Sequence, residues 1–303
     1  MGGVSLLPLE HRKGIMTLMI QDIYPHKLKN TFIPGLEADA SSLIIHFNSE
    51  GMILVKEEGK PFLRLSDFKK VPETLTYLFS MDEDNIFLAE DESVIAPEGT
   101  CYKKIRDFRR MEVPKKSVFE AFTAKQLNAW YTNNRYCGRC GSLTGRSTIE
   151  RAITCDKCGN IIYPRVVPAV IVAVINRGQT REEDRIVLTK YSGRADVPYY
   201  ALIAGFTEIG ETLEETVARE VMEETGLNVK NIKYYKSQPW GVADDIFTGF
   251  YCELDGPDKI VRDEQELAVA EWVKREDVVL QPDQFSLTNE MMTLFKEGKE
   301  PVN

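Results

Sequence analysis

The segment GFTEIGETLEETVAREVMEETGL, residues 205–227, constrains the fold of this 303-residue chain more than any other stretch. Thr212, followed three residues later by Glu215, forms a capping box, in which two side chains satisfy free N–H groups at the start of a helix. Gly226 is suited to end the same helix, because glycine adopts the left-handed conformation of a C-terminal cap without steric cost. The segment therefore predicts a helix over about 212–225 with both ends specified.

Three glutamates of this helix fall beside its apolar stripe instead of opposite to it. With about 100° of rotation per residue, Val217 and Val221 define the buried stripe. Glu220, Glu223 and Glu224 project onto a patch that overlaps this stripe. Carboxylates turned toward a protein interior lose hydration and repel each other, so they are stable there only when protonated or bound to cations. The pattern therefore predicts a site for Mg²⁺ or Mn²⁺, which prefer oxygen ligands.

Four of the six cysteines stand in two Cys-x-x-Cys-Gly motifs, CGRCG at 137–141 and CDKCG at 155–159. Four thiolates close a tetrahedral zinc site without an open position, so we expect one structural zinc ion per chain. A redox role for one pair is the alternative, but a repeated pair at this spacing is explained more simply by zinc. The predicted zinc ligands are Cys137, Cys140, Cys155 and Cys158.

A zinc ribbon can also bind nucleic acid, which gives a second hypothesis from another class of protein. The segment between the two motifs carries Arg146 and Arg151 together with the acid Glu150, and it has no aromatic residue to stack on a base. We therefore favour a scaffold role for the ribbon.

The formal net charge of −9 argues against broad binding to nucleic acid or to anionic membranes, which require a basic surface. The longest apolar stretch, around 166–175, is too short to span a bilayer, and the N-terminal segment lacks the apolar core of a signal peptide. We therefore expect a cytoplasmic protein without a membrane partner. Hydrophobic residues at 43% and charged residues at 28% are typical of a globular chain.

The chain divides into three predicted parts. These are a β-rich N-terminal domain at 1–116, a linker helix and four-cysteine zinc ribbon at 117–163, and an α/β domain at 164–303, which together give an α+β and α/β fold class. Predicted strands cover 41–47, 51–57, 85–90, 168–176, 185–191, 229–236 and 246–254, and predicted helices cover 117–135, 212–225 and 286–296.

The glutamate-rich segment resembles the signature of the Nudix hydrolases. Gly205, Glu211 and the run from Arg219 to Leu227 match every defining position of that signature. The resemblance implies an α/β/α sandwich with a mixed sheet, preceded here by the zinc ribbon and the β-rich domain. It also implies that Glu220 and Glu224 bind catalytic Mg²⁺ or Mn²⁺, that Glu223 acts as ligand or base, that Arg219 pairs with Glu211, and that the Ala204 carbonyl joins the metal ligands.

The predicted chemistry is hydrolysis of a P–O–P bond. Attack on the negatively charged phosphoric anhydride is slow until cations neutralise its oxygens and lower the pKa of the attacking water. The three histidines, His11, His26 and His46, are all far upstream of the glutamates, so a histidine base has no obvious candidate.

The order of features narrows the resemblance. The helix ending in Trp130-Tyr131, the two cysteine motifs, Tyr163-Pro164-Arg165 and the glutamate segment are similar to the NADH pyrophosphatases. That family implies hydrolysis of NADH or NAD⁺ to nicotinamide mononucleotide and AMP, removal of NAD caps from RNA, and a homodimer. We leave open two alternatives, which are a broader dinucleotide or ADP-ribose pyrophosphatase and a nucleic-acid-binding regulator with a Nudix sensor domain.

The narrower resemblance also implies substrate contacts. Tyr163 and Phe206 match aromatic residues that sandwich the nicotinamide ring, Glu150 matches a polar contact, and Glu266 matches a further metal ligand. Ser237-Gln238-Pro239-Trp240 matches the start of the Ser-Gln-Pro-Trp-Pro-Phe-Pro-x-Ser element of that family. The second half departs, reading Gly241, Val242, Ala243, Asp244 and Asp245, which puts the detail of substrate preference in doubt. We count all of 238–245 as predicted substrate contacts.

Overall fold

The structure is a computed structural model that describes residues 19–91, 94–193, 199–282 and 285–301. The prediction that the chain begins without a signal peptide concerns residues outside these ranges. Within them, no helix is long and apolar enough to cross a bilayer.

The N-terminal part is built on a five-stranded sheet in the order β1-β5-β6-β2-β4, accompanied by the two-stranded sheet β3-β7. Strands β2 and β6 pair in parallel, while the other pairs of both sheets are antiparallel. Three of these strands confirm the runs predicted from sequence, and β5, in the interior of the sheet, was not among them. The strands are β1 (Leu28–Lys29), β2 (Leu43–His46), β3 (Ile53–Lys56), β4 (Leu63–Arg64), β5 (Leu75–Met81), β6 (Asp84–Ala89) and β7 (Thr100–Lys103), with a short 3₁₀ turn η1 (Leu65–Asp67).

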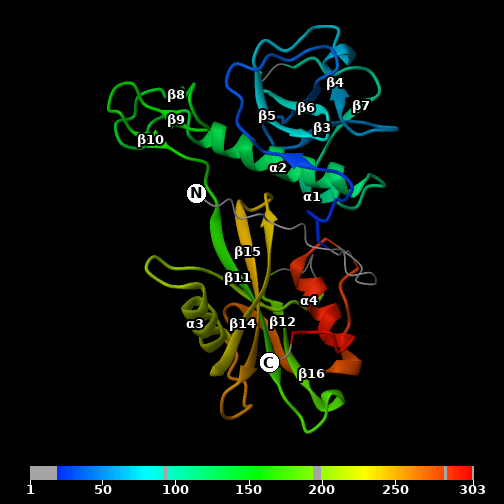
Figure 1. The fold of residues 1–303 in the computed structure, drawn as a ribbon, viewed down its shortest axis with the longest axis vertical. Coiled ribbons are helices and arrows are strands. Elements are labelled where there is room, and N and C mark those ends of the chain that lie inside the picture. Colours follow the sequence, from blue (N-terminus) through cyan, green and yellow to red (C-terminus); the bar gives the residue numbers. More distant parts are fainter. Residues whose placement is uncertain (1–18, 92–93, 194–198, 283–284, 302–303) are drawn as a thin grey trace, which may run out of the picture.

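After the short helix α1 (Ile105–Phe108), helix α2 (Lys115–Asn133) lies between the N-terminal sheet and the large C-terminal sheet (Figure 1). Val118 and Phe122 of α2 are buried in one cluster with Leu78 and Phe79 of the N-terminal sheet. The helix also touches the C-terminal sheet, as described below. The predicted boundaries at 116/117 and 163/164 therefore stay predictions, because α2 belongs to the packing of both neighbours.

A small three-stranded antiparallel sheet follows α2 and lies beside its C-terminal end (Figure 1). Its strands are β8 (Gly145–Arg146), β9 (Ile153–Thr154) and β10 (Ile161–Ile162). The first cysteine motif precedes β8 and the second connects β9 to β10, as expected for a zinc ribbon.

The C-terminal part contains a six-stranded mixed sheet in the order β14-β15-β11-β12-β16, with β13 paired to β11 outside this path. Strands β11 and β15 run parallel, and the remaining pairs are antiparallel. Strand β14 extends to Trp240, beyond the predicted end at 236. The strands are β11 (Val167–Asn176), β12 (Arg185–Tyr191), β13 (Ile203–Phe206), β14 (Val229–Trp240), β15 (Asp245–Leu254) and β16 (Leu267–Lys274), with 3₁₀ turns η2 (Arg181–Glu183) and η3 (Arg275–Asp277).

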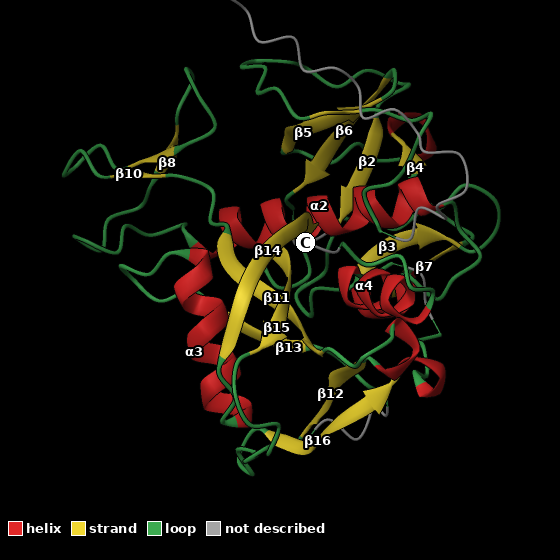
Figure 2. Ribbon diagram, turned by 60° about the horizontal axis from the view of Figure 1, so that its bottom comes forward, coloured by secondary structure: helices red, strands yellow, loops and turns green. Residues whose placement is uncertain are grey.

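Helices α3 (Leu213–Thr225) and α4 (Leu287–Lys296) cover opposite faces of this sheet (Figure 2). Alternate side chains of β11 point to opposite faces of the sheet, because successive residues of a strand alternate in direction. Val170 and Val172 pack in the cluster with α3, whereas Ile171 packs in the cluster with α4. Each fully buried branched side chain contributes roughly 1.5–3 kcal/mol. The predicted α/β/α sandwich with a mixed sheet is confirmed.

Candidate active site

Helix α3 begins and ends where its sequence predicts. The Thr212 hydroxyl accepts the N–H of Glu215 at 3.2 Å, and the Glu215 carboxylate accepts the N–H of Thr212 at 2.7 Å. At the other end Gly226 adopts φ 68° and donates its N–H to the carbonyl of Met222 at 2.8 Å. These caps satisfy the backbone groups at both helix ends, and Val217 and Val221 pack the helix on the sheet.

Two of the three predicted glutamates face the interior and one does not. Glu220 is 9% exposed and Glu224 is 1% exposed, beside the buried Val217 and Val221. The Glu223 side chain is 59% exposed, so its predicted place on the buried patch was wrong. The reason is rotational, because Glu223 lies farther from the apolar stripe around the helix than the other two.

Arg219 joins the acidic side chains of the segment. Its Nε and Nη2 atoms donate to the two oxygens of Glu211 at 2.6 and 2.9 Å, and Nη2 also donates to the carbonyl of Phe206 at 2.9 Å. Its Nη1 atom lies 2.7 Å from Glu220 Oε1 and 3.0 Å from Glu223 Oε2. Hydrogen bonds from Arg219 lower the pKa of Glu211 to about 2. The pairing of Arg219 with Glu211 matches the role that the resemblance implied.

Glu224 is a buried carboxylate that the protein leaves partly unsatisfied. Its Oε2 atom is enclosed and has no hydrogen-bond partner. Burial raises the pKa of Glu224 to about 8, with the charges of Glu220 and Glu266 acting in the same direction, while hydrogen bonding from the Ala204 backbone opposes the shift. Burial also raises the pKa of Glu220, against the effect of Arg219. A cation beside these carboxylates would relieve both desolvation and repulsion.

Gly205 supplies the space in which Glu220 lies. A Cβ atom built on Gly205 would lie 1.9 Å from Cδ of Glu220, which no side chain allows. The carboxylate of Glu220 therefore rests directly against the backbone of β13. Any larger residue at 205 would displace a predicted metal ligand.

These residues fit a divalent cation of the kind predicted from sequence. The unpaired oxygen of Glu224, the adjacent Glu220 and the nearby charge of Glu266 provide oxygen ligands of the type that Mg²⁺ and Mn²⁺ take. The glutamates are less closely grouped than the zinc ligands. Within the described part of the chain, the cysteines are the one group of three or more ligand side chains whose atoms lie within 4.8 Å of one another.

The four predicted zinc ligands converge. The Sγ atoms of Cys137 and Cys158 lie 3.6 Å apart, and those of Cys140 and Cys155 lie 3.5 Å apart. Bonds of about 2.3 Å to a tetrahedral zinc ion place sulfur atoms at similar separations. The backbone N–H of Arg139 hydrogen-bonds to Cys137 and lowers the pKa of that thiol to about 6, which favours the thiolate that zinc binds.

The glycine that follows each cysteine pair makes the turn that the motif predicts. Gly141 and Gly159 have φ values of 71° and 68°. Each donates its N–H, at 2.8 Å, to the carbonyl of the first cysteine of its own pair. A side chain would strain both turns.

Two arginines of the ribbon bind the rest of the protein. The guanidinium of Arg146 lies over the ring of Tyr131, 4.1 Å from its centroid, and pairs with Glu90. Arg151 donates to the carbonyl of Leu78 at 2.6 Å. These contacts support the scaffold role, because Arg146 and Arg151 are both engaged within the chain.

The C-terminal part of the chain resembles known proteins. The sequence profile of the NUDIX domain matches residues 166–294. This chain contains a NUDIX domain. Over 157 residues it is 41% identical to proteins named NAD-capped RNA hydrolase NudC from Escherichia coli (strain K12 / DH10B) and Shigella boydii serotype 18. The match covers 52% of this chain and spans 58% of the length of these curated relatives.

A solved NUDIX hydrolase from Nitrosomonas europaea is 21% identical and superposes with a TM-score of 0.41, covering 54% of this chain and 91% of that one.

The two predicted ring-clamp residues are both available on the surface. Tyr163, after the ribbon, is 56% exposed, and Phe206, at the end of β13 in the NUDIX domain, is 55% exposed. The Tyr163 hydroxyl donates to the Glu150 carboxylate at 3.0 Å, which joins two predicted substrate contacts. Both rings are open to a ligand, and their action as a clamp stays a prediction.

Residues 238–245, which were predicted to contact the substrate, make extensive contacts within the protein. Gln238 is 1% exposed, and its amide accepts the N–H of Leu287 and donates to the carbonyl of Phe285, each at 2.8 Å. The Trp240 ring meets Phe122 of α2 edge to face at 5.5 Å. Two residues predicted to contact the substrate therefore hold the NUDIX domain together and attach it to α2.

The turn after Trp240 continues this attachment. A Cβ atom on Gly241 would lie 2.2 Å from the carbonyl oxygen of Phe122. Lys125 donates to the carbonyl of Val242 at 2.7 Å and lies 3.6 Å from Asp244. Asp245 is 4% exposed, while Pro239 and Ala243 are exposed. This packing could not be predicted from the local sequence, because it depends on the position of a helix far upstream in the chain.

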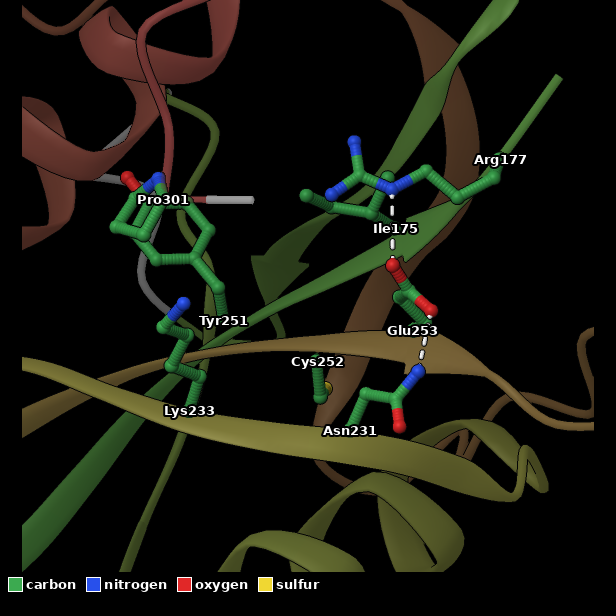
Figure 3. Close-up of a pocket in the computed structure, with 8 residues that line it drawn as sticks. All are labelled: Ile175, Arg177, Asn231, Lys233, Tyr251, Cys252, Glu253 and Pro301. Carbon is green, nitrogen blue, oxygen red and sulfur yellow. Dashed lines mark hydrogen bonds and ion pairs between the residues drawn. The ribbon is translucent and has the colours of Figure 1, made fainter. Parts of the chain in front are cut away.

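Figure 3 shows one pocket of the described structure, lined mostly by residues of β11, β14 and β15. Three of its polar side chains pair with each other, since Glu253 accepts from Arg177 at 3.1 Å and from Asn231 at 2.7 Å. It contains none of the predicted site residues. Its lining is Ile175, Arg177, Asn231, Lys233, Tyr251, Cys252, Glu253 and Pro301.

Proposed function

We propose that this protein is a divalent-metal-dependent pyrophosphohydrolase that splits NADH or NAD⁺ into nicotinamide mononucleotide and AMP. The observation that carries the proposal is Glu224, a buried carboxylate with an unpaired oxygen, beside Glu220 on the helix of a NUDIX domain. The name of the relatives, NAD-capped RNA hydrolase, supports a nicotinamide dinucleotide as substrate.

In this mechanism Glu220 and Glu224 would hold the cations, and the Ala204 carbonyl and Glu266 would be further ligands. Mg²⁺ or Mn²⁺ held there would neutralise charge on the phosphate oxygens and lower the pKa of the attacking water. Arg219 fixes Glu220 and Glu211, so that the acids keep their places as the substrate enters. Glu223, exposed at the rim of the patch, takes the proton released when water attacks phosphorus and one P–O bond of the anhydride breaks.

Substrate recognition in this proposal rests on exposed aromatic residues. Tyr163 and Phe206 stack on the nicotinamide ring, and Glu150 orients Tyr163 through their 3.0 Å hydrogen bond. The exposed residues of 238–245 border the dinucleotide. Removal of NAD caps from RNA, a homodimeric assembly, a cytoplasmic location and the zinc ion in the ribbon belong to the same proposal.

A specific observation favours a second candidate, a broader dinucleotide or ADP-ribose pyrophosphatase. Gly241 and Val242 contact α2 through its backbone and Lys125, so part of the segment predicted to read the substrate is occupied within the protein. An enzyme with fewer contacts to the nicotinamide half would accept a wider range of substrates.

Product analysis distinguishes these candidates. The zinc-loaded protein is incubated with Mg²⁺ and, side by side, NADH, NAD⁺, ADP-ribose and diadenosine polyphosphates, and products are separated by chromatography. We expect NADH and NAD⁺ to be hydrolysed faster than the other two substrates, with nicotinamide mononucleotide and AMP as the products. Faster hydrolysis of ADP-ribose would favour the broader enzyme, and binding of these compounds without turnover would favour the sensor hypothesis.

A further inference from the structure

Tyr191 is a residue outside the Nudix signature that reaches the proposed metal site. It is the last residue of β12, after an irregularity in the pairing of β12 with β16 between Lys190 and Tyr191. This irregularity places Tyr191 opposite Leu267, immediately after Glu266. The following residue, Ser192, donates its N–H to the carbonyl of Glu266 at 2.7 Å.

The side chain of Tyr191 extends to β13, the strand that carries Ala204. Its hydroxyl donates to the carbonyl oxygen of Ala204 at 3.4 Å. The backbone of Ala204 in turn hydrogen-bonds to Glu224. Residues 191 and 192 therefore contact both predicted metal ligands that lie outside helix α3, one through a hydroxyl and the other through the backbone.

We propose that Tyr191 is a positioning residue for the catalytic metal, and this inference rests on the proposed function. A carbonyl oxygen has two lone pairs, so Ala204 can accept the Tyr191 hydroxyl with one and keep the other for a cation. The hydroxyl fixes the peptide plane of Ala204 and thereby the direction of that second lone pair. Partners of this kind, one bond removed from the metal, orient its ligands and tune its affinity.

The contact would instead be purely structural if the hydroxyl served only to fasten the end of β12. The two roles differ in what they predict. A structural hydrogen bond contributes to stability and leaves metal affinity unchanged, whereas a positioning bond changes the affinity of the folded protein for the cation.

The test is Tyr191→Phe, which removes the hydroxyl and keeps the ring. We expect the dissociation constant for Mn²⁺, measured by electron paramagnetic resonance on zinc-loaded protein without substrate, to rise about tenfold. The Mg²⁺ concentration that gives half-maximal hydrolysis should rise in parallel, and turnover should recover at high Mg²⁺.

Tyr251→Phe is the matched control. Its hydroxyl also donates to a backbone carbonyl, that of Met291 at 3.0 Å, but in the cluster with α4 on the other face of the sheet. This variant should lose stability while its Mn²⁺ affinity stays at the wild-type value. Circular dichroism checks that each variant is folded. If Tyr191→Phe does not fold, Tyr191→Met, which also lacks a donor, is measured in the same way.

The outcomes separate this inference from the proposed function. Wild-type hydrolysis combined with unchanged Mn²⁺ affinity in Tyr191→Phe overturns the role of Tyr191 alone. Equal loss of Mn²⁺ affinity in Tyr191→Phe and Tyr251→Phe also overturns it, because the effect would then follow stability. If the wild-type protein binds Mn²⁺ but hydrolyses none of the four substrates, the proposed function is overturned. The Mn²⁺ affinity of Tyr191→Phe then decides the metal role of Tyr191 by itself. Absence of Mn²⁺ binding by the wild type overturns both.

Discussion

The guanidinium of Arg219 meets the carboxylate of Glu211 edge to edge, with Nε 2.6 Å from Oε1 and Nη2 2.9 Å from Oε2. This two-point pairing fixes the plane of the guanidinium, so its remaining N–H groups are aimed at Glu220, Glu223 and the carbonyl of Phe206. One side chain thus sets the positions of the loop and of the helix at the site.

Arg219→Lys tests this arrangement. A lysine keeps the positive charge but cannot make the paired contact, so we expect turnover to fall about tenfold or more with a smaller effect on stability. Steady-state kinetics at saturating Mg²⁺ and a thermal melt measure the two effects. Wild-type turnover in this variant would show that charge alone, and not geometry, is required.

Glu224→Gln should lower turnover by about a hundredfold or more while the fold is kept, because the change removes a charged ligand and preserves volume. Stability should not fall, since burial already disfavours the ionised carboxylate. The matched control is Glu214→Gln, an exposed glutamate in the first turn of the same helix. Near wild-type turnover in Glu224→Gln would contradict the proposed metal site.

Elemental analysis of the purified protein should find about one zinc ion per chain. Cys155→Ser should lose the zinc and lower the melting temperature, because the metal closes the ribbon on which Arg146 and Arg151 depend. The control Cys101→Ser, which replaces a free cysteine outside the cluster, should retain the zinc ion. Disulfides in place of zinc would overturn the assignment.

The stability of the N-terminal part should depend on the ionisation of Glu120. This side chain is 1% exposed, and burial raises its pKa from 4.5 to about 7, against the opposing charge of Lys116. The folded protein therefore holds a proton that the unfolded chain releases above about pH 4.5, so this contribution to stability is lost as pH rises through about 7.

Glu120→Gln should therefore raise the melting temperature relative to the wild type more at pH 8 than at pH 5. Glu112→Gln, an exposed glutamate just before α2, serves as the control and should give no such difference. Thermal melts of the three proteins at the two pH values measure the effect. An identical shift at both values would mean that Glu120 does not titrate in this range.

Replacing Phe206 or Tyr163 with Ala tests the ring clamp. Loss of one stacking contact, roughly 1–3 kcal/mol, should lower kcat/KM for NADH several-fold or more. Activity on ADP-ribose, which lacks the nicotinamide, should fall much less, because the metal site and the phosphates are untouched. Equal losses on both substrates would contradict the clamp and favour the broader pyrophosphatase.

The features that the sequence predicted well are those fixed by local geometry. The caps of α3 depend on Thr212, Glu215 and Gly226, all within one helix, and the cysteine motifs specify their own turns through Gly141 and Gly159. Periodicity also predicted the inward direction of Glu220 and Glu224.

Long-range packing accounts for what the sequence did not predict. The interior strand β5 and the edge strand β16 are stable only through their neighbours, and the burial of Gln238 follows from the position of α4. Tyr191 belongs to no motif, and its contact with Ala204 lies at the end of β12, beside the pairing irregularity. Signals of this kind exist only in three dimensions.

Gly241 rests against the carbonyl of Phe122 with no room for a methyl group. A change in this turn that altered the substrate range would therefore also disturb the attachment of the NUDIX domain to α2. Laboratory evolution at positions 241 and 242 would therefore select for packing of the NUDIX domain on α2 and for substrate specificity at the same time. Variants with altered substrate range should arise more readily at the exposed Pro239 and Ala243, where the side chains are less constrained by packing.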